Sequence, residues 1–164
     1  MIALACHPES RSRAVRSVHA EVTRKAGGVA VSYVVAGRID ELKLPTPGMH
    51  PLWKHTCCEL FVARRGGTAY HEFNFSPSGD WAAYAFTDYR QGGPIEVGNP
   101  GIVVRASSET LELKASVAGG AGPLLLALSA VIEERAGRLS YWALRHAPGK
   151  PDFHHRDAFA LELG

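Results

Sequence analysis

The feature that most constrains the fold of this chain is its punctuation by glycine and proline. The 164 residues include 17 glycines and 10 prolines, which interrupt most windows before a helical period can be sustained. The segments between these breaks are short and alternate apolar with polar side chains, as half-buried strands do. The sequence therefore predicts an all-β fold, a two-sheet antiparallel β-sandwich of the immunoglobulin-like or jelly-roll type with about nine strands and little helix.

The expected strands follow one another through tight turns that predict hairpins. They are Val15–Thr23, Val29–Ala36, Thr56–Arg64, Ala69–Phe75, Trp81–Thr87, Gly101–Ala106, Thr110–Val117, Leu124–Glu133, Leu139–His146 and Ala158–Leu163. Ile39–Leu42 fits either a short helical turn or an edge strand. Gln91–Gly101 is rich in glycine and proline, so we expect a long loop there.

Length and charge limit the classes of function. One domain over residues 1–164 is expected at this size. The net charge is only +2 and the lysines and arginines are scattered, which argues against nucleic acid or an anionic membrane as a partner. No apolar run is long enough to span a bilayer, and no signal peptide is recognisable, which favours a cytoplasmic protein. The odd count of three cysteines predicts reduced thiols.

The segment Leu52–Arg90 carries the densest chemistry, with aromatic side chains interleaved with carboxylates and an amide. Strand alternation places Phe73 and Phe75 in the core and Glu72 and Asn74 on the opposite face. In the preceding strand, Glu59 lies on the same face as this polar row if the hairpin register allows it.

A binding site for a saccharide or sugar derivative is the predicted function. Carboxylate and amide groups exchange hydrogen bonds with vicinal hydroxyls, and an aromatic ring stacks on the apolar face of a pyranose. We expect the ligand-binding residues to lie on a concave sheet face with aromatic groups at its rim. The polar set is Glu59, Glu72, Asn74 and Arg145, and the rim set is Trp53, Trp81 and Tyr89.

Other interpretations of the same residues remain open. The two tryptophans could plug the ends of a sandwich, and Glu72 could form a structural ion pair with Arg90 or Arg145. Glu59 and Glu72 could instead serve a glycoside hydrolase as its two carboxyl groups. Haem is a possible cofactor, with a histidine or Met49 as an axial ligand. No metal site is expected, because the histidines and cysteines lack zinc-ligand spacing.

Three segments resemble DOMON-like sandwich domains related to family-9 carbohydrate-binding modules, in particular a bacterial subgroup associated with UDP-N-acetylenolpyruvoylglucosamine reductase. These segments are Leu52–Val62, Tyr70–Arg90 and Tyr141–Phe159, and they contain the distinctive motifs EFNFSPSG and PDFH. The resemblance implies a β-sandwich that binds a small ligand, a sugar or haem in relatives, on one concave sheet face. The positions that match the motifs are Trp53, Glu59, Glu72, Asn74, Trp81, Tyr89, Arg90 and His154.

Overall fold

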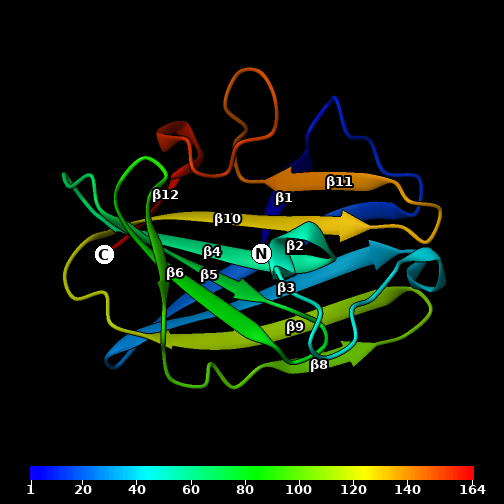
Figure 1. Ribbon diagram of the computed structural model, residues 1–164, viewed down its shortest axis with the longest axis horizontal. Helices are drawn as coiled ribbons and strands as arrows, with labels where there is room; N and C mark the ends of the chain where they lie inside the picture. The colour runs from blue at the N-terminus through cyan, green and yellow to red at the C-terminus, as the bar shows by residue number, and fades with distance from the viewer.

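The computed structural model describes residues 1–164 as twelve antiparallel strands with three short 3-10 turns and no α-helix (Figure 1). The strands are β1 (Ile2–Cys6), β2 (Val15–Lys25), β3 (Gly28–Gly37), β4 (Cys57–Arg64), β5 (Tyr70–Phe75), β6 (Trp81–Asp88), β7 (Gln91–Ile95), β8 (Val103–Ala106), β9 (Thr110–Ala118), β10 (Leu124–Glu133), β11 (Leu139–Ala143) and β12 (Leu161–Leu163). The 3-10 turns are η1 (Ile39–Glu41), η2 (Leu52–Lys54) and η3 (Arg156–Ala158).

Strand β1 joins two groups of strands into one hydrogen-bonded path. The order along the path is β7-β6-β5-β4-β10-β11-β1-β2-β3-β9-β8, and β12 pairs separately with β10. The first half of β1 pairs with β2, at Ile2–Leu4, and its end pairs with β11, at Ala5 and Cys6. A strand that changes partners along its length lets the sheet turn a corner, so that one half of the path folds over the other.

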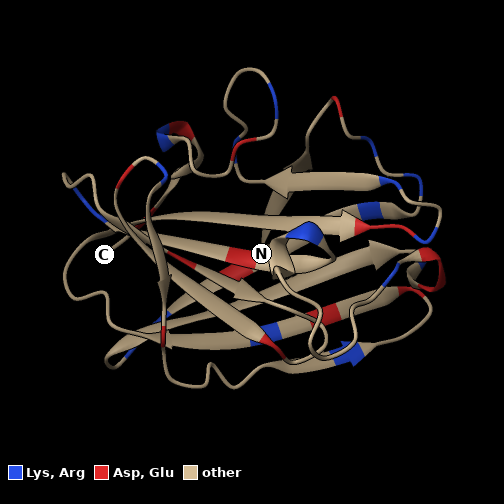
Figure 2. Cartoon of the chain, in the orientation of Figure 1, with Lys and Arg blue, Asp and Glu red and all other residues tan.

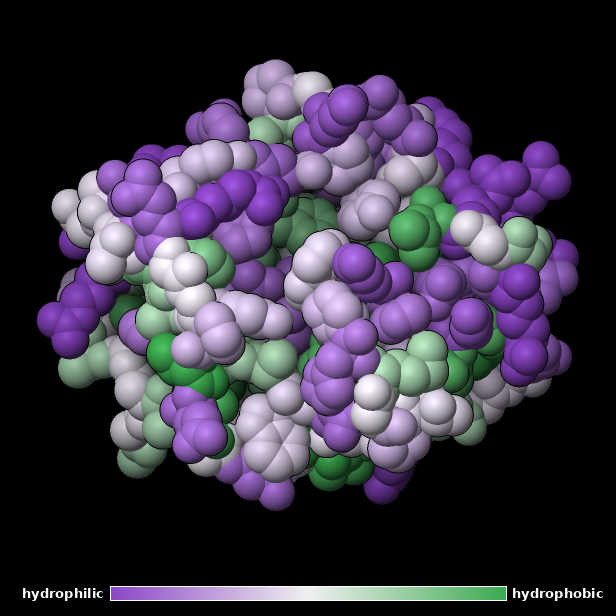
Figure 3. All heavy atoms as spheres, in the orientation of Figure 1, coloured by the Kyte–Doolittle hydropathy of each residue, from purple (hydrophilic) through white to green (hydrophobic).

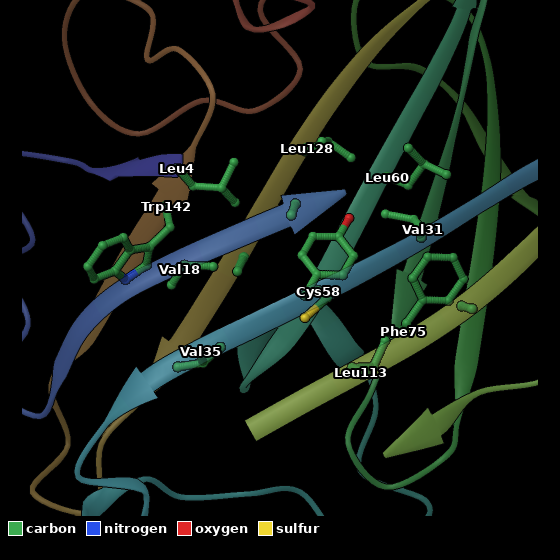
Figure 4. Packing of buried hydrophobic residues seen from close by; sticks show 14 of the residues in the cluster. Leu4, Val18, Val31, Val35, Cys58, Leu60, Phe75, Leu113, Leu128 and Trp142 are labelled. Atoms are coloured by element: carbon green, nitrogen blue, oxygen red, sulfur yellow. The ribbon is translucent and has the colours of Figure 1, made fainter. Parts of the chain in front are cut away.

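The core lies between the two halves of the path. A single cluster of 25 buried residues draws on β2, β3 and β9 from one half and on β4, β5, β10 and β11 from the other. Figure 4 shows Val31 and Val35 of β3 and Leu113 of β9 gathered with Leu60 of β4 and Leu128 of β10 in one cluster. The apolar residues on alternate positions of each strand therefore supply one continuous core.

One hydrogen bond crosses this core. Tyr33 of β3 is 1 % exposed, and its hydroxyl donates to the backbone carbonyl of Glu59 on β4 at 2.6 Å. A buried phenol needs such a partner, because an unpaired hydroxyl in an apolar interior is costly. The bond ties the strand that bears Glu59 to the opposite half of the molecule.

The all-β, antiparallel prediction is confirmed, and so are the hairpins β2–β3, β8–β9 and β10–β11 and the meander β4–β5–β6. The predicted strand number of about nine is too low, because the structure has twelve strands in one connected path. Two strands were not expected, β1 and β7. The second lies inside the expected loop Gln91–Gly101, where glycines and a proline still permit pairing at a sheet edge.

Charged residues are spread over strands and loops without a continuous stripe of one sign (Figure 2). None of the structural elements is a helix of the length and apolarity that a bilayer crossing demands. The face turned to the viewer in Figure 3 is mainly hydrophilic, with apolar patches set among the polar groups.

Candidate functional site

A cleft of about 940 Å³ lies on the outer face of the β4–β7 and β10–β11 strands. The segment that follows β11 forms one wall of it, and η2 forms another. The residues that line the cleft are Trp53, Lys54, Glu59, Glu72, Tyr84, Phe86, Arg90, Gly92, Gly93, Pro94, Val131, Leu139, Tyr141, Lys150, Pro151, Phe153 and His154. Its size falls within the range of small-molecule sites.

The polar row predicted from strand alternation lies beneath this cleft. The β4–β5 register pairs Glu59 with Asn74 and Phe61 with Glu72, so these four side chains share the outer face. Glu59, Glu72 and Asn74 are nevertheless buried, at 3 %, 4 % and 0 % exposure. Two carboxyl groups and an amide are thus buried on the outer face of the sheet, although such groups are usually exposed to solvent.

Burial controls the ionisation of the two carboxyl groups. It raises the pKa of Glu72 to about 7, although a hydrogen bond from Glu59, the nearby Asn74 amide and the Arg90 charge favour the ionised form. Burial also raises the pKa of Glu59 well above its usual range, and the charge of Glu72 raises it further. The pair therefore keeps one proton between two carboxyl groups near neutral pH, as closely spaced carboxyls do.

His154 links the pair to the turn between β6 and β7. The backbone N–H of Arg90 donates to the Tyr70 hydroxyl at 3.0 Å, and the same hydroxyl is hydrogen-bonded to Nδ1 of His154 at 2.9 Å. Nε2 of the same ring lies 3.4 Å from Oε1 of Glu72. Burial lowers the pKa of His154 to about 4, so an uncharged imidazole lies beside Glu72 at pH 7.

No lysine or arginine forms an ion pair with either buried carboxyl. The guanidinium of Arg90 pairs instead with Asp152, at 2.9 Å, and Arg145 has no carboxylate partner. The structural ion pair that the sequence allowed for Glu72 is therefore not formed. The amide of Asn74 is also free, since neither its oxygen nor its nitrogen has a fully formed hydrogen bond within the protein.

Aromatic side chains form the walls. Tyr84 and Phe86 lie on β6 in register with Glu72 and Tyr70, and their rings stand 6.3 Å apart in a stacked arrangement. Phe153 meets Tyr141 edge to face across the opposite side, with centroids 6.0 Å apart. The lysines Lys54 and Lys150 and the guanidinium of Arg90 stand at the mouth.

The cleft includes some of the residues predicted from sequence and leaves others outside. Trp53, Glu59, Glu72, Arg90 and His154 line it, whereas Asn74 does not, although it lies beside Glu59 on the same sheet face.

Three of the predicted residues lie elsewhere. Trp81 is paired with Phe75 and so belongs to the other side of the sheet. Tyr89 lines a small neighbouring pocket, and Arg145 is exposed beyond the end of β11. The expected strand to His146 placed Arg145 with Tyr141, but the strand stops at Ala143.

Several cleft residues were not predicted from the sequence. Tyr84 and Phe86 follow from the same alternation that singled out Glu72, once the β5–β6 register is applied. Phe153 and Lys150 carry no such signal. They stand in an irregular segment that passes over the sheet, and only the three-dimensional structure brings it there.

The site geometry bears on the alternative chemistries. A retaining glycosidase holds its carboxyl groups about 5 Å apart around the sugar, and an inverting one holds them farther apart. Glu59 and Glu72 interact directly with one another, and burial raises the pKa of both carboxyl groups. Of the possible axial ligands of haem, His154 has its Nδ1 hydrogen-bonded to Tyr70, and the Met49 sulfur accepts from the backbone N–H of Thr46. No cluster of three or more potential metal ligands occurs.

Comparisons with known proteins find similarity in structure but not in sequence. No family model matches the chain, and no curated protein matches it. A solved structure from Bacteroides uniformis, described as that of a proposed carbohydrate-binding protein, superimposes with a TM-score of 0.62 at 14 % identity. The match covers 87 % of this chain and 75 % of the other. At this identity the likeness concerns the fold, and this chain therefore shares its fold with that protein from Bacteroides uniformis.

Proposed function

We propose that this domain binds a saccharide or sugar derivative in the cleft over β4 and β5, without catalysing a reaction. The observation that carries the proposal is the pair Glu59 and Glu72, which are buried at the cleft floor without a basic side chain to neutralise them. Buried polar groups normally have partners within the protein. The Asn74 amide beside them has no fully formed hydrogen bond within the protein, and a ligand with several hydroxyl groups would add hydrogen bonds to this buried polar row.

The walls favour a saccharide over other polyhydroxylated or polar ligands. Sugars present an apolar face as well as hydroxyls, and the rings of Trp53, Tyr84 and Phe86 offer flat surfaces for it. The fold shared with a proposed carbohydrate-binding protein is consistent with this proposal. We further propose, from the motifs EFNFSPSG and PDFH, that the chain is a DOMON-like domain related to family-9 carbohydrate-binding modules.

A glycan screen by isothermal titration calorimetry tests the proposal, with two tryptophan variants as a matched pair. Trp53→Ala removes a cleft wall, whereas Trp81→Ala removes a partly exposed tryptophan outside the cleft. Loss of an aromatic stacking contact is worth about 1 kcal/mol, so we expect Trp53→Ala to weaken binding by about five- to tenfold and Trp81→Ala to leave it unchanged.

Two results would argue against this function. One is the absence of binding by the unmodified protein across neutral, amino and acidic sugars. The other is release of reducing ends from a bound glycan that disappears in Glu72→Gln, which would favour a glycoside hydrolase instead.

A further inference from the structure

A second cavity, of about 670 Å³, opens at one end of the core, away from the saccharide cleft. It lies between the two halves of the strand path, where the end of β4 and the start of β5 face β3 and the end of β9. The end of β9 and the start of β10 are at the left of Figure 1. The residues lining it are Val29, Val62, Ala63, Arg64, Gly67, Thr68, Ala69, His71, Phe73, Ile95, Val97, Gly98, Asn99, Ser116, Val117, Ala118, Gly119, Gly120 and Leu124.

The bottom of this cavity is part of the hydrophobic core. Val29, Phe73 and Leu124 belong to the main core cluster, and Val62 and Val117 pack against it from the walls. A hollow that reaches the core and is lined by such groups offers water few hydrogen bonds, so it favours an apolar occupant. Its volume suits a small molecule with an extended hydrocarbon chain.

The loop between β7 and β8 closes one side of the cavity. The backbone N–H of Ser116 on β9 donates to the carbonyl of Pro100 at 2.8 Å, which fixes this loop against the sheet. Val97 of the loop packs against the core cluster. The opening is therefore shaped by paired backbone and packed side chains.

Charge at the cavity is of one sign. None of its lining residues is an aspartate or glutamate, and the cation Arg64 projects from the core-facing side of β4, opposite Leu124 in register. Arg64 has no carboxylate partner, whereas its neighbour Arg65 lies 3.7 Å from Glu162. A guanidinium without a partner beside an apolar hollow matches an amphiphile with an anionic head.

We propose that this cavity is a binding site for a single-chain amphiphile with an anionic head group, whose hydrocarbon chain enters between the two halves of the core while Arg64 binds the head. The carboxylate of a fatty acid and the sulfate of an alkyl ester share this chemistry. The site shares no lining residue with the saccharide cleft, so this proposal does not depend on the function proposed above.

Titration of the full chain with laurate, dodecyl sulfate, dodecanol and dodecylamine, each below its micellar concentration, tests the proposal by calorimetry. Laurate and dodecyl sulfate distinguish a carboxylate from a sulfate head. We expect one equivalent of an anionic amphiphile to bind, and dodecylamine to bind at least about tenfold more weakly, because its ammonium group meets Arg64.

Three variants locate the site. Arg64→Gln is expected to weaken binding of the anionic amphiphile about tenfold, and the matched variant Arg65→Gln to leave it unchanged. Ala69→Trp places a large ring at the exposed mouth of the cavity and is expected to abolish binding without unfolding the protein, which circular dichroism checks.

Failure of both anionic amphiphiles to bind would overturn the proposal. Equal affinity for the ammonium and carboxylate compounds, or undiminished binding by folded Ala69→Trp, would overturn it as well. Competition between laurate and a cleft-bound saccharide would place the amphiphile in the other site and would equally refute it.

Discussion

Replacing Glu72 with glutamine is expected to change how stability depends on pH. The folded protein holds the Glu72 proton up to about pH 7, whereas the unfolded chain releases it near 4.5. The favourable contribution of the protonated carboxyl is therefore complete below pH 4.5 and is lost as pH rises through 7. At about 1.36 kcal/mol per pH unit, the stability of the wild type should fall by about 3 kcal/mol relative to Glu72→Gln between pH 4.5 and 8.

The comparison with the variant matters because other groups titrate in the same range. The pKa of His154 is lowered to about 4, so this ring favours the folded state as pH rises from 4 to 6.5, in the opposite direction. That contribution occurs in both proteins and largely cancels in their difference. Loss of the Glu72 charge also lowers the pKa of Glu59 in the variant, which adds to the difference rather than reducing it.

Urea unfolding at 25 °C and half-unit pH steps, followed by circular dichroism, measures the difference. Glu162→Gln removes an exposed carboxyl on β12 and serves as the control, with a curve expected to run parallel to that of the wild type. Parallel curves for the wild type and Glu72→Gln would refute the reasoning, since they would mean that Glu72 ionises as a solvated carboxyl does.

Two further substitutions test how the cleft is held together. In Gly92→Ala the new Cβ would lie 1.9 Å from the carbonyl oxygen of Ala85, so β6 and β7 must separate. We expect the free energy of unfolding in urea to fall by about 1–3 kcal/mol. Gly93→Ala, with open space around it, should lower it far less. Tyr70→Phe removes the hydroxyl that connects the β6–β7 turn to His154, and we expect a loss of about 1–2 kcal/mol together with movement of the histidine ring signals in NMR spectra.

Much of the fold follows from local sequence. The glycine and proline breaks located ten strands near their observed positions, because tight turns need particular residues and half-buried strands need alternation. The strand Gln91–Ile95 was not predicted, because its own composition is that of a loop and its pairing with β6 depends on the partner strand. Ile2–Cys6 was missed because its five residues, IALAC, are all apolar and show no alternation of apolar with polar side chains, although their burial alternates in the structure.

The site was predictable where it rests on a regular strand. Alternation within β5, together with the register to β4, was sufficient to bring Glu59, Glu72 and Asn74 to one face. Their burial was not predictable, since it depends on the segment that carries Phe153 and His154 over the sheet. Side-chain type alone likewise could not separate Trp53 in the cleft from Trp81 outside it.

The burial of the carboxyl pair has an energetic consequence that bears on function. Near neutral pH the raised pKa of Glu72 alone costs the folded state about 3 kcal/mol, a sizeable fraction of the stability of a small domain. Apolar side chains of similar volume at such positions are often neutral or stabilising, so packing gives no reason for two glutamates there. A ligand that donates hydrogen bonds to Glu72 would offset the cost only when bound. The buried Glu72 carboxyl would thus lower the stability of the ligand-free protein and raise its affinity for the ligand.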